Sequence, residues 1–373
     1  MLISTDHSIE RICCRFRIDG TFSSFEPHGN GNVNDTFLVF CRNGKQTNRY
    51  TLQRINSEVF ENPKGLMENF SRVTAHLRRK AVDGQHAFET LILIPTMDGE
   101  SFLREGNSYW RMTKFIAGGR SFEIPKNDNH AYEAAKAFGL FQANLNDLPG
   151  PALVETIPDF HNTRKRFDDF LFALEKDAHG RSREVGDLVA FAKQREVLAE
   201  KIRLKDFPSR VVHNDTKLNN VLLHKDTGQG MCVVDLDTVM PGCVLHDFGD
   251  LVRTAACSSL EDETDLSKVR FLPSVFEAIA QGYLEAAGAM LSDEEIEFLP
   301  LAPSVITYEL GLRFLTDYLE GDRYFKTRWP GHNLDRTRTQ FKLLSSLEES
   351  LDLMKSAVQR IAAERDGYAP SAQ

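Results

Sequence analysis

Apolar and polar residues follow two different periods along this chain. In the first third they alternate, as they do in half-buried strands. The stretches with this alternation are residues 22–40, as a strand–turn–strand, and residues 49–55, 91–97, 101–104 and 109–116. Two further stretches, residues 6–20 and 64–80, have apolar residues at helical spacing. The first third therefore predicts a small antiparallel sheet with two helices.

From residue 130 onward, apolar residues recur every three to four positions, which predicts helices. These helices are residues 130–145, 167–174, 188–202, 303–320 and 343–361. Between the two regions, residues 117–120 (Ala-Gly-Gly-Arg) suit a hinge, although an ordinary linker has the same composition. The predicted fold class is α+β, with a small antiparallel-sheet N-lobe over residues 1–116 and a larger, mainly helical C-lobe over residues 117–373.

Composition narrows the possible partners. The chain has 373 residues, 41% of them hydrophobic, which is enough to fill ordinary cores in two lobes. It has 45 Lys and Arg residues against 54 Asp and Glu residues, a formal net charge of −9. This balance argues against nucleic acid or an anionic membrane as the main partner. Binding of an anionic nucleotide triphosphate would need local positive charge, most simply from a bound metal ion.

Cysteine usage and the N-terminus bear on the compartment. The six cysteines include no Cys-x-x-Cys pair and are too sparse for a disulfide framework. The N-terminal residues carry charges without an apolar signal core, and the longest aliphatic run is residues 91–94. We therefore expect a cytoplasmic protein without membrane segments, and no obligate protein partner is evident.

The clearest candidate chemistry follows residue 210. His213, Asp215 and Asn220 lie in one short run, and Asp235 ends an apolar, strand-like run fifteen residues after Asn220. Phosphoryl transfer in protein-kinase-like enzymes needs this set, because one carboxylate receives the proton of the attacking hydroxyl while an Asn oxygen and a second carboxylate hold Mg²⁺. The spacing predicts Asp215 as the base and Asn220 and Asp235 as metal ligands.

A hairpin would bring the two metal ligands together. Residues 221–224 and 231–235 are apolar runs, and the Asp and Gly residues of the segment 225–230 between them suit a turn. Two oxygen ligands would then converge on a hard cation that keeps some of its waters. The alternative is a loop with a capping Asp and a turn Asn, each of which is common singly. We expect His213 to orient the loop, and Asp247 or Asp250 to fix its shape by accepting hydrogen bonds.

The predicted sheet offers candidate nucleotide-binding groups. Gly29, Asn30 and Gly31 would let backbone N–H groups approach phosphates, although any Gly-Asn hairpin looks the same. Gln53 stands where a protein-kinase-like lobe places its phosphate-binding Lys. The backbone of Lys114, Phe115 and Ile116, next to the hinge, is the candidate edge for the base.

Longer motifs carry a family resemblance. Residues 213–220 (His-Asn-Asp-Thr-Lys-Leu-Asn-Asn), 234–242 and 247–250 (Asp-Phe-Gly-Asp) resemble the aminoglycoside phosphotransferase-like superfamily. Within this superfamily, the chain resembles the N-acetylhexosamine 1-kinases more closely. This closer resemblance also includes residues 110–111, 114–116, 313–322 and 333–340. The resemblance implies a protein-kinase-like two-lobe fold. It also implies transfer of the γ-phosphoryl group of ATP, with Mg²⁺, to the anomeric hydroxyl of N-acetylglucosamine or N-acetylgalactosamine.

The resemblance also assigns roles to residues. It implies that Arg313 and Tyr324 contact the sugar, and we place Asn32 and Asn34 on the substrate side as well. Asn32 departs from the pattern, because close relatives are expected to have His there. Lys217, two residues past the base, is our candidate for neutralising the γ-phosphate in place of the missing Lys.

Three alternatives stay open at this stage. Arg313 and Asp317 fall on one helical stripe, which an ordinary i,i+4 surface pair would also explain. The acceptor could be an aminoglycoside, choline or homoserine, an idea that the acids Glu309, Asp317, Glu320 and Asp322 keep open and Arg313 opposes. The protein could also be a catalytically dead nucleotide- or sugar-binding protein, because the usual Lys is missing.

Overall fold

The computed structural model describes residues 5–29, 33–82 and 88–367. The chain forms two compact units, each of which is described by itself. The first consists of Met1–Gly119, Leu148–Pro158 and Leu236–Val239, and the second of Arg120–Asp147, Asp159–Asp235 and Met240–Gln373. The short segment Leu236–Val239 thus belongs with the N-terminal unit, although both of its chain neighbours belong to the other one. The predicted boundary between residues 116 and 117 stays a prediction.

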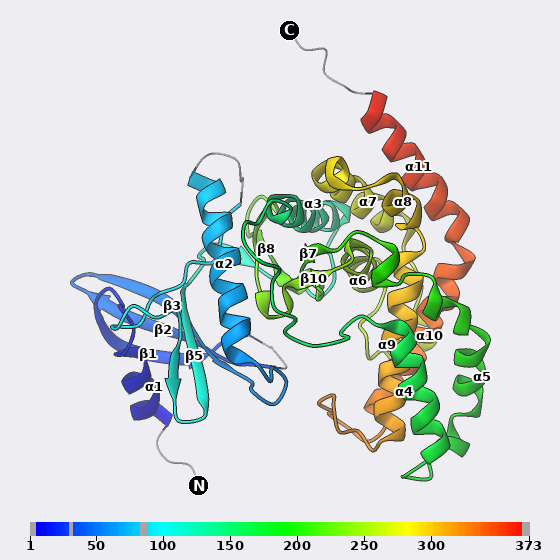
Figure 1. The fold of residues 1–373 in the computed structure, drawn as a ribbon, viewed down its shortest axis with the longest axis horizontal. Coiled ribbons are helices and arrows are strands. Elements are labelled where there is room, and N and C mark those ends of the chain that lie inside the picture. Colours follow the sequence, from blue (N-terminus) through cyan, green and yellow to red (C-terminus); the bar gives the residue numbers. More distant parts are fainter. Residues whose placement is uncertain (1–4, 30–32, 83–87, 368–373) are drawn as a thin grey trace. The chain divides into compact units, whose positions relative to one another are not determined.

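The first unit is built on a five-stranded antiparallel sheet (Figure 1). Its strands, in spatial order, are β1 (Thr21–Pro27), β2 (Asp35–Asn43), β3 (Gln46–Ile55), β5 (Ser108–Lys114) and β4 (Leu103–Glu105). The alternation of apolar residues buries one set, including Val39, Leu52 and Met112, in a common core. Helix α1 (Thr5–Cys13) adds Ile9 and Ile12 to this core, and the long helix α2 (Pro63–Val82) buries Leu66, Phe70 and Val73.

Two predictions for this unit were wrong in extent. The helix expected over residues 6–20 ends at Cys13. Residues 91–97 do not form a strand, although Ile94 N–H donates to Met112 O and Lys114 N–H donates to Ile92 O. The pairing with β5 stops after the isolated bridge at Leu93, because the neighbouring residues of β5, Ser108–Trp110, pair with β4 and the N–H of Thr96 donates to Glu100 O.

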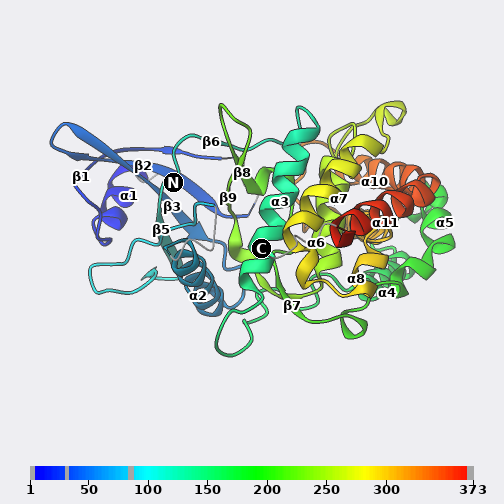
Figure 2. The same ribbon diagram turned by 90° about the horizontal axis from the view of Figure 1, so that it is seen from above.

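The second unit is mainly helical (Figure 2). Its helices are α3 (Asp128–Leu145), α4 (Thr163–Lys176), α5 (Gly186–Gln194), α6 (Val244–Ala255), α7 (Pro273–Ala287), α8 (Asp293–Phe298), α9 (Ala302–Leu319), α10 (His332–Glu349) and α11 (Leu351–Gly367). Apolar faces of α4, α5, α9 and α10 meet in one core that includes Phe170, Leu312 and Leu344. Two short strand pairs precede α6: β7 (Arg210–Val212) with β10 (Met240–Gly242), and β8 (Val221–His224) with β9 (Gly230–Val233).

Several helix predictions needed correction. The helix expected over residues 188–202 stops at Gln194 and continues as a separate 3₁₀ turn, Glu196–Glu200. The helix expected over residues 343–361 is two helices that meet at Ser350. Helix α6 was not predicted, although its apolar residues, such as Phe248 and Leu251, recur at helical spacing. Its polar residues, such as His246 and Asp250, are buried as well.

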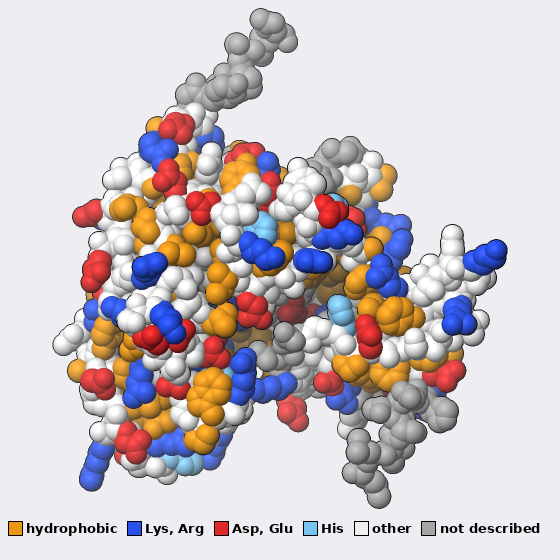
Figure 3. Space-filling model, turned by 180° about the vertical axis from the view of Figure 1, so that it is seen from behind, with side chains coloured by type: hydrophobic (Ala, Val, Ile, Leu, Met, Phe, Trp, Pro, Cys, Tyr) orange, Lys and Arg blue, Asp and Glu red, His pale blue; other side chains and the backbone are white. Residues whose placement is uncertain are grey.

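Acidic and basic side chains are interspersed on the face of the molecule that Figure 3 shows, without a large field of one sign. Within the described ranges, no helix combines the length and the apolar composition needed to cross a lipid bilayer.

Candidate functional site

The loop between β7 and β8 brings Asp215, Lys217 and Asn220 together. Lys217 Nζ lies 3.0 Å from Asp215 Oδ1. Asn220, in the 3₁₀ turn Leu218–Asn220, donates its amide N–H groups to Asp215, at 3.0 Å to Oδ2 and 2.8 Å to the backbone oxygen. The Asp215 side chain keeps 27% of its surface exposed. A partly exposed carboxylate is thus held from two sides by polar neighbours.

The charge state of Asp215 follows from these neighbours. Burial by itself would raise the pKa of this carboxyl, but the ammonium of Lys217 and the amide of Asn220 outweigh burial, and the pKa is lowered. Asp215 is therefore ionised at neutral pH and can accept a hydrogen bond from an incoming hydroxyl. The same carboxylate raises the pKa of Lys217, which stays charged.

His213 and Asp247 shape the loop from behind, as expected. Asp247, on α6, accepts the backbone N–H of His213 at 2.7 Å and that of Asn214 at 2.6 Å. His213 Nε2 lies 2.9 Å from Val234 O, and its Nδ1 accepts the N–H of Asp215 at 3.3 Å. The imidazole therefore ties the start of the loop to the end of β9. These contacts confirm that His213 orients the loop and that Asp247 fixes its shape.

The hairpin of β8 and β9 sets the position of Asp235. Val221 pairs with Val233, and the N–H of Val234 donates to Asn220 O at 2.9 Å. Asp235 follows with a φ of 59°, in the left-handed region that is uncommon for a residue with a side chain. Such a backbone departs from the strand at that residue, which is a recurrent feature of functional positions.

The donor set fits a hard divalent cation. Asn220 uses its amide nitrogen on Asp215, and among the described residues no hydrogen bond engages its Oδ1. An amide oxygen and a carboxylate are ligands that Mg²⁺ accepts while it keeps water and phosphate oxygens as its remaining ligands. No group of three or more His, Cys, Asp or Glu residues in the described ranges could hold a metal ion alone. A site of this kind needs the phosphates of a substrate to complete it.

The first unit contains a second polar network, centred on Arg111 and Asp237. Arg111, on β5, forms an ion pair with Asp237 and donates from Nε to Gln53 Oε1 at 2.9 Å. Gln53 Nε2 in turn donates to Thr36 Oγ1 at 3.1 Å. The predicted substrate residue Asn34 donates to Asp237 Oδ2 at 2.5 Å and accepts the N–H of Asn56 at 2.9 Å. Asp237 comes two residues after the predicted metal ligand Asp235, so this network fixes the segment that follows the metal position.

The pair of Arg111 and Asp237 was not predicted from the sequence. The Arg111 side chain is only 1% exposed and its guanidinium lies over the Phe70 ring of α2, with Cζ 4.3 Å from the centroid. A buried cation in contact with Gln53 stands beside the place where the Lys was expected. No local sequence signal indicates it, because its partner lies 126 residues away.

The other residues predicted to bind the nucleotide belong to the first unit. Gly29 has a φ of 77°, and a Cβ at that residue would meet nothing within 4 Å. Asn30, Gly31 and Asn32 lie outside the described residues. In the segment next to the hinge, Lys114 N–H donates to Ile92 O at 2.8 Å and Phe115 N–H donates to Arg49 O at 3.1 Å. Ile116 follows them, half-buried. All these assignments stay predictions.

Arg313 and Tyr324 lie together in the second unit. The Arg313 guanidinium carbon lies 5.2 Å from the ring centroid of Phe160, 5.7 Å from that of Tyr324 and 5.4 Å from that of Phe325. Tyr324 keeps 60% of its surface exposed. Among the described residues, no carboxylate pairs with Arg313. The arrangement is an aromatic-lined patch with a guanidinium whose donors are available to a ligand.

The alternative of a surface pair between Arg313 and Asp317 is wrong. Asp317 is buried and accepts the backbone N–H groups of Arg323 and Tyr324 at 2.8 Å and of Phe325 at 2.9 Å. Its carboxylate therefore folds the segment after α9 and presents Tyr324 and Phe325. The spacing of four residues placed both charges on one stripe but could not show that Asp317 serves this turn.

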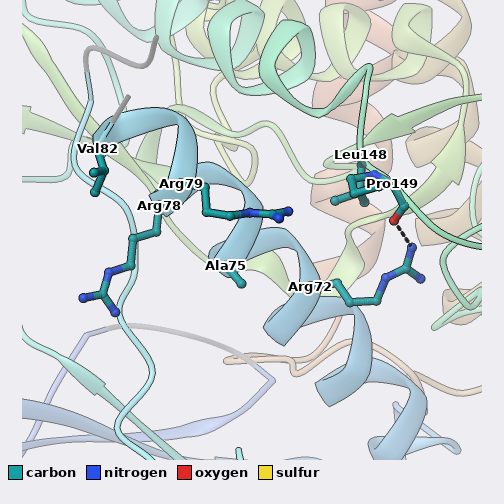
Figure 4. A pocket seen from close by; sticks show the side chains of 7 residues that line it. All are labelled: Arg72, Ala75, Arg78, Arg79, Val82, Leu148 and Pro149. Atoms are coloured by element: carbon teal, nitrogen blue, oxygen red, sulfur yellow. Dashed lines mark hydrogen bonds between the residues drawn. The ribbon is translucent and has the colours of Figure 1, made fainter. Parts of the chain in front are cut away.

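A separate pocket of about 720 Å³ lies beside α2 in the first unit (Figure 4). Its lining residues are Arg72, Ala75, Arg78, Arg79, Val82, Leu148 and Pro149. Arg72 donates to Pro149 O at 3.0 Å and to Pro151 O. None of the predicted site residues lines this pocket, and its lining has no carboxylate or amide side chain that could hold a metal ion.

Comparison with known proteins now adds to this geometry. Residues 24–292 match the model of the phosphotransferase enzyme family (APH). A microcompartment-associated aminopropanol kinase has a similar structure, at a TM-score of 0.60 and 14% identity over 94% of this chain and 98% of that one. Choline kinase from Cryptosporidium parvum gives 0.57 and 13% over 96% and 99%. Spectinomycin phosphotransferase, solved with ADP and spectinomycin, gives 0.53 and 12% over 98% and 99%. These similarities confirm the predicted protein-kinase-like fold, with an antiparallel-sheet N-terminal region and a helical C-terminal region.

Proposed function

The chain belongs to the phosphotransferase enzyme family, and from this premise we propose that it is an N-acetylhexosamine 1-kinase. It would transfer the γ-phosphoryl group of ATP to the anomeric hydroxyl of N-acetylglucosamine or N-acetylgalactosamine. The observation that carries the proposal is the loop in which Lys217 and Asn220 hold an ionised, partly exposed Asp215. The sugar itself is inferred from the motif resemblance and from the patch around Arg313.

Asp215 is the group that receives the hydroxyl proton. Phosphoryl transfer has a loose transition state, so orientation of the hydroxyl contributes more than the strength of the base. A carboxylate with a lowered pKa suits this task, because it accepts a hydrogen bond throughout the neutral range and takes the proton late. The anomeric hydroxyl also favours such a weak base, because the ring oxygen makes it more acidic than an ordinary alcohol.

Asn220 and Asp235 would hold Mg²⁺. When bound, the metal supplies neutralisation of the charge on the β- and γ-phosphate oxygens. Asn220 has a second task, since its amide nitrogen fixes the Asp215 carboxylate while its oxygen is left for the metal. Its backbone oxygen also receives the N–H of Val234, next to Asp235, so one residue links the base with both strands of the hairpin.

The nucleotide assignment rests on the first unit and on the relatives. A solved relative, spectinomycin phosphotransferase, binds ADP, which supports ATP as the phosphoryl donor here. We assign the phosphates to Gly29, Asn30 and Gly31 and the base to the backbone of residues 114–116. Gln53 is neutral and hydrogen-bonds to Thr36 and Arg111, so we assign γ-phosphate neutralisation to Lys217, whose side chain is 40% exposed.

The patch around Arg313 suits a neutral hydroxylated acceptor. Arg313 can donate several hydrogen bonds in one plane, and sugar hydroxyl and acetamide oxygens can accept them. Phe160, Tyr324 and Phe325 supply apolar faces beside this cation. A second arginine lies near it: burial and then the charge of Arg313 lower the pKa of Arg166. Two neighbouring arginines disfavour a cationic acceptor.

Most of the acidic residues that suggested a cationic acceptor form hydrogen bonds with other groups of the protein. Both oxygens of Glu309 accept hydrogen bonds, from His161 at 2.8 Å and from Thr163 at 2.7 Å. Asp322 accepts from Arg181 at 2.7 Å and from Asn333 at 2.9 Å. Asp317 holds the turn after α9. An aminoglycoside, choline, homoserine or aminopropanol would therefore find few unpaired carboxylates in this part of the chain.

An acceptor panel tests the proposal. ATP consumption is measured with N-acetylglucosamine, N-acetylgalactosamine, glucose, galactose, an aminoglycoside, choline and homoserine, and the product is identified by NMR. We expect turnover with an N-acetylhexosamine and a product whose phosphate is bound to the oxygen of carbon 1. Phosphorylation of an amino alcohol or aminoglycoside alone would replace the acceptor while keeping the family chemistry. Absence of transfer to every acceptor, with nucleotide still bound, would support a binding protein instead.

A further inference from the structure

His161 lies behind the catalytic loop and has no role in the chemistry described so far. His161 lies in the segment directly before α4, and its side chain is 4% exposed. Nδ1 lies 2.8 Å from Glu309 Oε1, and Nε2 lies 2.9 Å from the backbone oxygen of Asn214, the residue before the base. A buried titratable ring thus connects α9 with the peptide that positions Asp215.

The partners of His161 fix its protonation state. Glu309 Oε2 accepts the hydroxyl of Thr163 at 2.7 Å, so both oxygens of Glu309 face donors, as those of an ionised carboxylate do. The oxygen of Asn214 is a carbonyl and can only accept. Because both partners are acceptors, each ring nitrogen has to carry a hydrogen, and a ring with two N–H groups is an imidazolium.

The surrounding charges agree with this assignment. Burial by itself would lower the pKa of His161, but the charge of Glu309 and the two hydrogen bonds outweigh burial and raise it. Two other titratable groups face the ring from α6: His246, whose ring centroid is 5.1 Å away, and Asp250. Burial, and then the positive charge of His161, lower the pKa of His246 to about 3, so His246 is the neutral member of the pair.

The peptide held by His161 is a strained one. Asn214 has a φ of 64°, in the left-handed region. Its N–H donates to Asp247 at 2.6 Å and its carbonyl accepts from His161, so the residue is fixed at both ends. Loss of either contact removes one of the hydrogen bonds that hold the backbone directly before Asp215.

We propose that His161 is a positioning residue for phosphoryl transfer, acting as an imidazolium that bridges Glu309 and the carbonyl of Asn214. It touches no substrate and acts through the orientation of Asp215. The inference rests on the proposed function to the extent that Asp215 is the base. As pH rises, His161 loses a proton and one of its two hydrogen bonds, and kcat falls with it.

Two measurements on the full chain test this. First, the ¹⁵N and ¹H shifts of the His161 ring are followed by NMR between pH 6 and 9. We expect two protonated nitrogens at pH 7 and a titration that coincides with the alkaline decline of kcat. A neutral ring at pH 7, or a titration unrelated to that decline, overturns the inference even if no variant folds.

Second, His161→Gln is compared with His246→Gln, a neighbouring buried ring in α6 that makes no described hydrogen bond to the catalytic loop. A displaced base can lower turnover by up to about 100-fold. We expect His161→Gln to lower kcat within that range, with KM for ATP and acceptor little changed, and to abolish the alkaline decline. His246→Gln should keep it. An unchanged alkaline decline in His161→Gln overturns the inference.

The two proposals fail in different ways. If the wild-type chain phosphorylates no acceptor, the proposed function fails while the imidazolium seen by NMR still stands. If it phosphorylates an acceptor but His161 is neutral, only the role of His161 fails.

Discussion

At the scale of single residues, Asp215 is a carboxylate that is ionised, partly exposed and held in place by Lys217 and Asn220. Asp215→Asn removes the proton acceptor but keeps the size and one oxygen of the side chain. We expect a loss of about 10²–10⁴ in kcat, which is the usual contribution of a general base. Binding of ATP and sugar, measured by calorimetry, should persist.

A matched control lies in the same region. Asp226 is exposed in the turn between β8 and β9, and Asp226→Asn should leave turnover unchanged. Near-normal turnover in Asp215→Asn would remove Asp215 from its role.

Arg111 and Asp237 allow a second residue-level prediction. Removal of one partner of a buried ion pair leaves an uncompensated charge and costs about 3–5 kcal/mol. Arg111→Met should therefore lower the free energy of unfolding by that amount in urea titrations. The double variant Arg111→Met with Asp237→Asn should recover part of the loss, because it removes the buried charge.

The same sheet supplies the control for this pair. Arg54 and Asp35 form an ion pair on β3 and β2, with side chains 50% and 51% exposed. Exposed pairs contribute about 0–1 kcal/mol, so Arg54→Met should have little effect. Equal losses in Arg111→Met and Arg54→Met would show that the buried network carries no special stability.

The catalytic and metal-binding residues that the sequence predicts share one property: they lie close together in the chain at a characteristic spacing. Asp215, Asn220 and Asp235 lie on one loop and hairpin, so a short motif contains them. Arg111 and His161 have partners far away in the chain, Asp237 and Glu309, and neither residue is unusual in its own segment. Only the folded chain shows that Arg111 stands beside Gln53.

At the scale of elements, α6 couples packing to the site. Asp247 holds the catalytic loop from this helix, and two residues later Gly249 allows α6 to approach α9. A Cβ on Gly249 would lie 2.6 Å from the backbone oxygen of Ala302. Gly249→Ala therefore forces the helices apart, and overpacking of this kind costs about 1–3 kcal/mol. We expect a lower melting temperature and a lower kcat, because Asp247 moves with the helix.

Gly186, in the first turn of α5, is the matched control for this prediction. A Cβ there would meet nothing within 4 Å, and alanine has the better helix propensity by up to about 1 kcal/mol. Gly186→Ala should keep or raise the melting temperature and leave kcat unchanged. A neutral Gly249→Ala would mean that α6 and α9 adjust without cost.

Elements were predictable where one face is buried and the other is wet. Strand β3 and helices α2 and α3 have such faces, and their predicted ranges were close to the observed ones. The burial of polar residues such as His246 and Asp250 in α6 does not follow from their spacing, and Ser350 separates two helices that share one apolar pattern. Burial of polar residues and breaks without Pro or Gly are decided by tertiary packing, which a periodicity does not contain.

At the scale of the whole molecule, buried titratable groups set how stability depends on pH. Glu309 has a pKa lowered to about 2, since His161 and its hydrogen bond outweigh burial. A lowered carboxyl pKa contributes stability that is present above the unfolded value, near 4.5, and is lost as pH falls toward 2. Glu309 therefore cannot account for any loss of stability above about pH 5.

The lowered pKa of His246 predicts a loss of stability that begins at a higher pH than the loss due to the carboxylates. Its pKa falls to about 3, mainly through burial, against 6.5 for an exposed ring, so the unfolded chain binds the proton more readily between these values. Stability should therefore decrease as pH drops below 6.5, by about 2 kcal/mol at pH 5. His246→Gln removes the titrating ring, and its free energy of unfolding in urea should stay level from pH 6.5 to 5 while the wild type declines. Parallel declines in both proteins would assign the loss to other groups, and a level wild-type profile would mean that His246 is protonated in the folded chain.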